Sequence, residues 1–221
     1  MAIREEILLD PDPLKLSFYP KKNQQLDSTG STLPVVVFFG DSRAYHWVLP
    51  SNIHGFHFIN RGIGGQTSAY VMARFGYDVK PLKPNIVILQ VGINDLINIP
   101  IFFSPQKQII VDNCKANINK IVSESQSIGS TVILTTIFPL GKLPRDQMPF
   151  WSDVITAIND VNGYIRSLKG GRVIIFDTTR ALADSQGFVK QEYSQDVVHL
   201  NEAGYRILNA ELEKVLGRLR L

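Results

Sequence analysis

The chain has 221 residues, of which 44% are hydrophobic and 19% charged, which suits one sizeable folded domain and excludes an intrinsically disordered chain. The net charge is +3 and no stripe of lysine or arginine appears, so nucleic acid is not an expected partner. The single cysteine, Cys114, excludes an intrachain disulfide and a cysteine-based zinc site.

The first residues lack the uninterrupted apolar segment of a secretory signal. No apolar run reaches the roughly 18 to 20 residues that a membrane-spanning helix needs. We therefore expect a soluble, cytoplasmic protein. Residues 1–33 show no regular hydrophobic period, and we interpret them as an irregular N-terminal arm in front of a single domain at 34–221.

Five short apolar segments predict strands, at residues 35–39, 56–60, 86–91, 131–137 and 173–176. Most are continuous and rich in β-branched residues, which is typical of strands buried on both faces of a parallel sheet. Apolar residues at helical spacing lie between the strands and after the last one. This alternation predicts an α/β protein, a three-layer α/β/α sandwich around a five-stranded parallel sheet.

Ser42 follows the first predicted strand by three residues, at the edge where parallel α/β sheets bind their ligands. A serine at this position is a candidate nucleophile, because its hydroxyl stands at the edge of the sheet and the backbone N–H groups of the next helix are unpaired. The segment Gly40-Asp41-Ser42 also fits an ordinary strand end followed by a helix cap, which is the alternative for this motif taken alone.

His199 precedes the last predicted helix, and Asp196 lies three residues before it. This spacing lets the carboxylate accept a hydrogen bond from Nδ1 while Nε2 faces a serine hydroxyl, as a general base requires. The alternative is that both residues cap the helix that starts near Asn201.

Ester hydrolysis places negative charge on the carbonyl oxygen, which needs fixed hydrogen-bond donors. Gly64 and Gly65 follow the second strand and allow a backbone N–H to face the site. Asn94 follows the third strand and offers a side-chain amide, and the N–H of Ser42 is a third donor. Each of these residues also suits an ordinary turn, so only their conjunction at one edge indicates catalysis.

Four sequence blocks occur in order along the chain: FFGDSRA at 38–44, NRGIGGQTS at 60–68, VGIND at 91–95 and DVVHLNEAGY at 196–205. With these blocks the sequence resembles the SGNH hydrolases, also called the GDSL esterase/lipase family, from about residue 35 to residue 216. The resemblance implies a flavodoxin-like fold and a serine esterase or lipase that acts through an acyl-serine intermediate on a small-molecule ester, with no metal and no cofactor.

The resemblance also implies a role for each site residue. Ser42 is the expected nucleophile, His199 the base and Asp196 its partner, while Ser42, Gly65 and Asn94 form the expected oxyanion hole. One position departs from the family pattern, because Arg43 stands where the namesake motif has leucine.

Substrate contacts are harder to predict than catalysis. The apolar run at 96–103 follows Asn94 directly and could line an acyl pocket, or it could pack beneath the edge of the sheet. Arginines near the nucleophile could meet an anionic leaving group. The candidate substrate-binding residues are Arg43, Arg61, Ile99, Phe102 and Phe103.

Two other functions suit the same residues. An acyltransferase would pass the acyl group to an alcohol instead of water, and residue types do not distinguish it from a hydrolase. A flavodoxin-like binding module without catalysis would hold an anion on its glycine turns and helix N-termini, but it has no need of Asp196 and His199 at the edge. Labelling by a fluorophosphonate separates this module from the hydrolase. Oligomeric state and acyl preference are not predicted.

Overall fold

The structure is a computed structural model, which describes residues 12, 15–19, 32–102, 104–143, 146 and 148–219. Its described strands form one sheet of five parallel strands in the order β2-β1-β3-β4-β5. The predicted five-stranded parallel sheet is thus confirmed, with small differences at the strand ends. The strands are β1 (Val35–Gly40), β2 (His57–Gly62), β3 (Ile86–Gln90), β4 (Thr131–Thr135) and β5 (Val173–Phe176).

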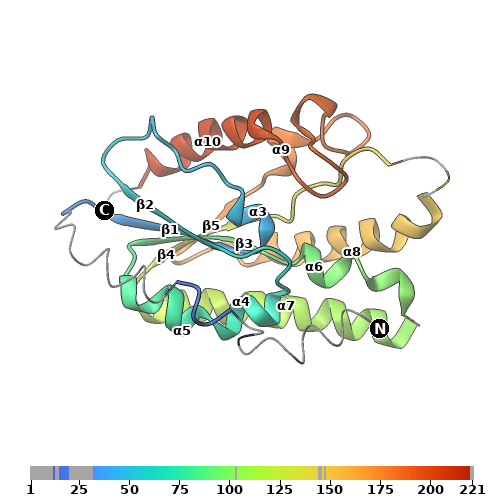
Figure 1. The fold of residues 1–221 in the computed structure, drawn as a ribbon, viewed down its shortest axis with the longest axis horizontal. Helices are drawn as coiled ribbons and strands as arrows, with labels where there is room; N and C mark the ends of the chain where they lie inside the picture. Colours follow the sequence, from blue (N-terminus) through green and yellow to red (C-terminus); the bar gives the residue numbers. More distant parts are fainter. Residues whose placement is uncertain are drawn as a thin grey trace.

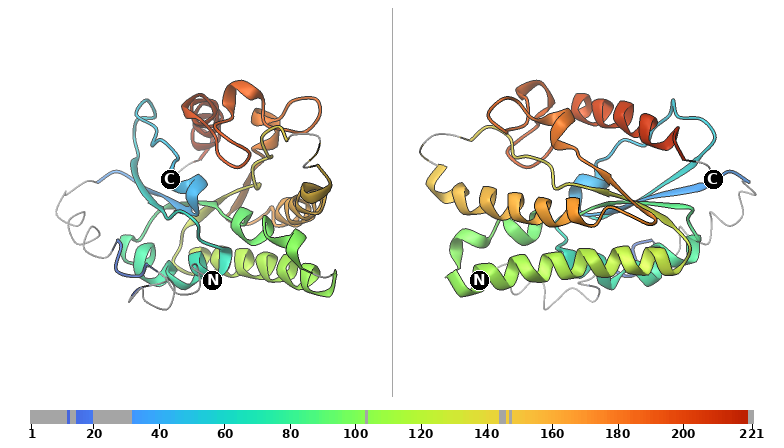
Figure 2. Two further views of the ribbon diagram at one scale, coloured as in Figure 1. Left: turned by 45° about the vertical axis from the view of Figure 1, so that its right-hand side comes forward. Right: turned by 180° about the vertical axis from the view of Figure 1, so that it is seen from behind.

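Helices cover both faces of the sheet, as the alternating pattern predicts (Figure 1). The two views of Figure 2 show the same three layers, with α9 and α10 on one face and the long α7 and α8 on the other. The α-helices are α3 (Ser42–Tyr45), α4 (Ser68–Ala73), α5 (Phe75–Asp78), α6 (Ile93–Leu96), α7 (Ser104–Ser127), α8 (Met148–Ser167), α9 (Thr179–Leu182) and α10 (Glu202–Leu216). Short 3-10 helices are η2 (Lys80–Leu82), η3 (Ile99–Ile101) and η5 (Gln191–Tyr193).

Each face of the sheet builds its own hydrophobic core, because successive strand residues point to opposite sides. In β1, Val37 and Phe39 join the core that α7 and α8 cover, whereas Val36 and Phe38 join the core beneath α10. All four are completely buried. This two-sided burial explains why the strand sequences are continuously apolar instead of alternating.

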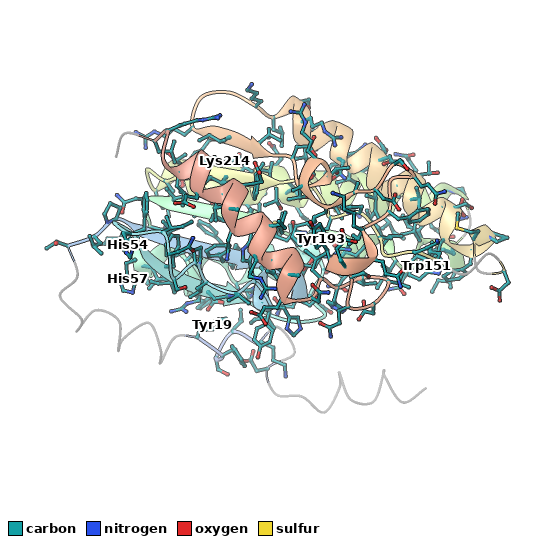
Figure 3. The ribbon with its side chains drawn as sticks, turned by 90° about the horizontal axis from the view of Figure 1, so that it is seen from above. Tyr19, His54, His57, Trp151, Tyr193 and Lys214 are labelled. Carbon is teal, nitrogen blue, oxygen red and sulfur yellow. The ribbon has the colours of Figure 1, made fainter. Side chains whose placement is uncertain are left out.

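The strand ends and the loop before α10 meet at one edge of the sheet. Figure 3 shows His54 and His57 towards one end of the molecule, well away from Tyr193, which lies in η5 shortly before His199. His57 is the first residue of β2, so it stands at the start of its strand and not at the end. The fold therefore brings only His46 and His199 to the edge where Ser42 lies.

Tyr19 of the predicted N-terminal arm contacts the domain. Tyr19 is buried, and its hydroxyl donates a hydrogen bond of 2.7 Å to the Gly62 carbonyl at the end of β2. The Arg61 guanidinium stacks over the same ring, 4.6 Å from its centre. Most other residues of the arm lie outside the described part of the chain, so its outline stays a prediction.

Candidate active site

The turn that carries Ser42 is fixed by close backbone packing. Gly40 has φ of +152°, and a Cβ atom there would lie 1.7 Å from the Gln90 carbonyl oxygen, so only glycine fits. Asp41 caps the short helix α3 by accepting a hydrogen bond of 2.9 Å from the Arg43 N–H. Ser42 is the first residue of α3 and is 7% exposed. The strand end and cap therefore hold the serine at the edge of the sheet.

Ser42, His199 and Asp196 form a continuous hydrogen-bonded chain. The His199 Nε2 atom lies 3.1 Å from the Ser42 Oγ atom, although 157 positions separate the two residues in the sequence. On the other side of the ring, Nδ1 lies 2.9 Å from one carboxylate oxygen of Asp196 and 3.2 Å from the other. These distances suit proton transfer from the serine to the imidazole and stabilisation of the imidazolium by the carboxylate.

Hydrogen bonds to Asp196 stabilise the loop that carries His199. The Asp196 Oδ1 atom accepts hydrogen bonds of 2.7 Å from the backbone N–H groups of Val198 and His199. Partial burial acts to raise the pKa of Asp196, but the hydrogen bonds from His199 and Val198 outweigh it and hold this pKa below its usual range. The carboxylate is therefore ionised at neutral pH, as the partner of a catalytic histidine must be.

The loop that carries Gly65, one of the expected oxyanion donors, packs against Ser42. A Cβ atom on Gly64 would lie 3.9 Å from the Ser42 Cβ atom, which places the loop after β2 against Ser42. Gly65, the next residue, has φ of +75°, a conformation that favours glycine. The Asn94 side-chain amide donates a hydrogen bond of 3.0 Å to the Gln66 carbonyl, so this amide is tied to the Gly65 loop. An amide nitrogen carries two N–H groups, and this bond uses one of them.

A buried arginine that the sequence analysis overlooked supports this loop. Arg74, between α4 and α5, is completely buried and donates hydrogen bonds to the Gln66 side chain at 2.5 Å, the Arg61 carbonyl at 2.7 Å and the Gly40 carbonyl at 2.6 Å. It also pairs with Asp78 at 2.9 Å. Its position among apolar neighbours and the acid four residues later are the only signals in the sequence.

A second polar cluster joins the oxyanion loop to Asn94. Asp95 accepts hydrogen bonds from the backbone N–H of Ser68 at 2.8 Å and from its hydroxyl at 2.6 Å. The Asn117 amide of α7 donates to the same hydroxyl at 3.0 Å. Burial raises the pKa of Asp95, while the hydrogen bonds from Ser68 act in the opposite direction. Both polypeptide segments of the expected oxyanion hole are therefore fastened to each other.

The expectation that Arg43 and Arg61 face the substrate needs correction. Arg43 is completely buried, and its guanidinium donates to the Val198 carbonyl at 2.9 Å and to the Phe138 carbonyl at 3.1 Å. Arg61 is 4% exposed and stacks on Tyr19. Both side chains turn into the protein because aromatic rings and backbone carbonyls are available there to contact the guanidinium.

The apolar segment after Asn94 is divided between the core and a surface groove. Ile99 is 2% exposed and belongs to the core, which corrects its assignment to a substrate pocket. Phe102 is 38% exposed and lines a groove of about 680 Å³ together with Asn94, Asn98 and Ile101. Phe103 lies outside the described residues.

Over the described ranges, no three His, Cys, Asp or Glu side chains gather closely enough to hold a metal ion. No helix in the described part of the chain is both long and apolar enough to cross a lipid bilayer.

With this geometry in place, comparisons with known proteins identify the class. Residues 29–207 match the GDSL-like Lipase/Acylhydrolase family. The chain therefore belongs to this family, and its class is that of the hydrolases that act on ester bonds. Family membership favours the enzyme over the binding module considered from the sequence.

Individual relatives agree with this class. The chain is 28% identical over 193 residues to platelet-activating factor acetylhydrolase IB subunit alpha1 of Rattus norvegicus, covering 84% of this chain and 76% of that protein. It is 31% identical over 97 residues to an acetylxylan esterase of Geobacillus stearothermophilus, covering 42% of this chain and 43% of that protein. A crystal structure of a GDSL-like lipase from Bacteroides thetaiotaomicron superposes with a TM-score of 0.71 at 22% identity, covering 93% of this chain and 98% of that one. This last likeness supports the fold.

Proposed function

We propose that the chain is a serine hydrolase that cleaves carboxylic esters through an acyl intermediate on Ser42. The observation that carries the proposal is the 3.1 Å contact between Ser42 Oγ and His199 Nε2, continued to Asp196 on the far side of the ring. Nothing in the fold requires these two residues to meet, whereas a serine nucleophile needs a base at this distance.

The proposed reaction has two halves. His199 takes the Ser42 proton as the hydroxyl oxygen attacks the ester carbonyl carbon, and the oxyanion accepts hydrogen bonds from the N–H groups of Ser42 and Gly65 and the Asn94 amide. His199 then gives this proton to the departing alcohol, which leaves an acyl-serine. Water, deprotonated by His199, attacks the acyl carbon, and the serine oxygen leaves with the returned proton as the acid is released.

Solvent access to the base supports water as the acceptor, rather than the alcohol of an acyltransferase. The His199 side chain is 29% exposed and that of Asp196 is 51% exposed, so water can approach the imidazole from solvent. Product analysis with and without added alcohols tests this choice. We expect free acid as the main product in both cases, and an ester of the added alcohol as the main product would assign a transferase instead.

The groove at Asn94 supports an acyl-binding role. Asn94, an expected oxyanion donor, lines the groove, whereas His199 and Ser42 do not, so the groove begins beside the expected position of the ester carbonyl and away from the proposed general acid. The acyl substituent of a tetrahedral intermediate points away from the general acid that protonates the leaving group. We therefore assign the groove, with Phe102 and Ile101 on its wall, to the acyl chain of the ester.

The relatives named above include an acetylhydrolase and an acetylxylan esterase, and the groove is large enough for longer acyl groups than acetate. A panel of p-nitrophenyl esters from acetate to palmitate tests acyl preference. We expect Phe102→Ala to change the ranking of chain lengths. Phe150→Ala is the matched control, because Phe150 is similarly exposed but does not line the groove. Equal rankings in both variants would overturn the acyl assignment.

The nucleophile is tested directly with a fluorophosphonate probe and mass spectrometry. We expect the label on Ser42, and no label and no esterase activity in Ser42→Ala. Ser123→Ala serves as the control, because Ser123 is an exposed serine of α7. Retained activity in Ser42→Ala would overturn the proposed function.

A further inference from the structure

Arg43 is buried in a way that stability alone does not explain. The side chain is completely buried, it makes no ion pair with any described carboxylate, and its Nη2 atom has no hydrogen-bond partner among the described residues. Removing a cation from water is costly, and an apolar side chain of similar size is often as stable or more stable in such a place. Leucine, which stands here in the namesake motif, would be the simpler residue.

The contacts of Arg43 lead from the nucleophile to the loop of the base. Its backbone follows Ser42 in α3, and its guanidinium Nε donates a hydrogen bond of 2.9 Å to the carbonyl of Val198, the residue before His199. Nη1 donates at 3.1 Å to the Phe138 carbonyl, and the guanidinium lies 5.2 Å from the centre of the Phe138 ring. Arg43 thus connects the helix of Ser42 to the loop of His199. Its two hydrogen bonds, to Val198 and to Phe138, fix the orientation of the planar guanidinium.

Further hydrogen bonds fix the two segments that Arg43 connects. The Arg43 carbonyl accepts a hydrogen bond of 3.0 Å from the buried Tyr205 hydroxyl of α10. The Val197 carbonyl accepts one of 2.8 Å from Gly141 N–H, in the loop that begins at Phe138. Burial lowers the pKa of Arg43 to about 10, against the effect of nearby Asp41, so the guanidinium is charged at neutral pH. Its hydrogen bonds to the carbonyls are therefore charge-assisted.

We propose that Arg43 is a positioning residue, which holds the loop of residues 194–199 so that the His199 ring meets the Ser42 hydroxyl. The inference rests on the proposed function, because it gives Arg43 its role through the serine and the base. Besides Ser42, the His199 ring contacts Asp196 on one side and the edge of the exposed His46 ring, with 5.7 Å between the ring centres. Without the guanidinium, the Val198 carbonyl loses its donor and we expect the loop to shift by about 1 Å.

The test is a double-mutant cycle on hydrolysis of p-nitrophenyl acetate, with Arg43→Leu, His199→Ala and the double variant assayed well below their unfolding temperatures. A shift of about 1 Å in a catalytic group can cost on the order of 100-fold in rate. We therefore expect Arg43→Leu to lower kcat by about 100-fold with little change in KM. In the His199→Ala background the same substitution should change the residual rate by less than about 3-fold, because the residue acts through the base.

Asn209→Leu is the matched control. Asn209 of α10 is also buried, and its side chain makes two hydrogen bonds to the segment after α3, at 2.8 Å from Trp47 Nε1 and 2.9 Å to the Val48 carbonyl. It does not contact the loop of His199. We expect Asn209→Leu to lower the unfolding temperature while keeping kcat close to that of the parent enzyme.

Three outcomes would overturn the inference. The first is a folded Arg43→Leu enzyme with normal kcat, and the second is an equally large effect of Arg43→Leu with and without His199. If Arg43→Leu does not fold, Arg43→Lys decides, because lysine keeps the charge but loses the planar fork; a normal kcat in that variant is the third. The Ser42→Ala variant separates failure of this inference from failure of the proposed function. If Ser42→Ala is inactive, the proposed function still holds, and if it is active, the proposed function is wrong as well.

Discussion

The two sides of the candidate site are held in place by different means. The base side is open to solvent, because the side chains of His199 and Asp196 are partly exposed. Their loop is held by the backbone carbonyls of Val197 and Val198 and by the packing of these two valine side chains against the core. The oxyanion side is supported from within by completely buried Arg74 and by the Asp95 cluster. Fixed donors stabilise an oxyanion only if they need no reorganisation, whereas a general base must exchange protons with water. The two kinds of support suit these two tasks.

The contrast predicts that changes on the base side affect chemistry far more than stability. His199→Ala should lower kcat by about 10⁴- to 10⁶-fold, because the serine loses its proton acceptor. The free energy of unfolding should change little, since the ring is partly exposed. Steady-state kinetics and urea unfolding measure the two effects. His54→Ala, which removes an exposed ring away from the site, is the control and should keep most of the activity.

Changes in the support of the oxyanion side should affect stability first. Arg74→Met breaks the buried pair with Asp78 and removes the donors to the Gly40 and Arg61 carbonyls. Breaking a buried ion pair by removing one partner typically costs about 3–5 kcal/mol. We expect a loss of this size in the free energy of unfolding, measured in urea. Arg206→Ala, which breaks an exposed pair with Glu202, should give no measurable loss.

Substitution of Asn94, an expected oxyanion donor, should lower kcat as substitution of His199 does, but by a smaller factor. Asn94→Ala removes one oxyanion donor, which typically costs about 100- to 1,000-fold in kcat. The KM should change less than kcat, because the donor is needed most in the transition state. Asn98→Ala is the control, since Asn98 lines the same groove without adjoining the Gly65 loop. Equal losses in both variants would count against an oxyanion role for Asn94.

The sequence was sufficient to predict the sheet and the residues that meet at its edge. Continuous β-branched segments are buried on both faces, and parallel strands necessarily end at the same edge, so Ser42 and Asn94 could be placed from their positions after two strands. The spacing between His199 and Asp196, and the position of His199 before the last helix, made it a candidate base. Local periodicity and one topological rule thus place these residues at the edge, whereas their expected roles came from the resemblance to the SGNH hydrolases.

The roles of the arginines could not be predicted in this way. Whether Arg43 points to solvent or inward depends on Phe138 and Val198, which lie 95 and 155 positions away in the sequence. Besides Asp78, Arg74 donates to the Gln66 side chain and to the backbone carbonyls of Arg61 and Gly40. Every residue type has a backbone carbonyl, so these partners cannot be recognised from the sequence. Spacing rules therefore identify the reacting groups more readily than the groups that hold them in place.

The smallest predicted effect concerns the carboxyl group beneath the nucleophile. Asp41 is completely buried, and burial raises its pKa from 3.8 to about 6, although nearby Arg43 acts in the opposite direction. A pKa that is higher in the folded state than in the unfolded chain means that the folded state binds the proton more tightly. The contribution of Asp41 to stability is therefore fully present below about pH 4 and is lost as the pH rises through about 6.

This shift corresponds to a loss of up to about 3 kcal/mol between the two limits. Asp41→Asn keeps an oxygen that can accept the hydrogen bond from Arg43 N–H, but it does not ionise. Other buried carboxyl groups with raised pKa, such as Asp95, are present in both proteins. Their contributions therefore cancel in the difference between the two unfolding free energies. We therefore expect Asp41→Asn to gain stability relative to the parent as the pH rises from 4.5 to 7.5, measured by urea unfolding. If the unfolding free energies of the two proteins change with pH by the same amount across this range, the pKa of Asp41 is not raised in the folded state.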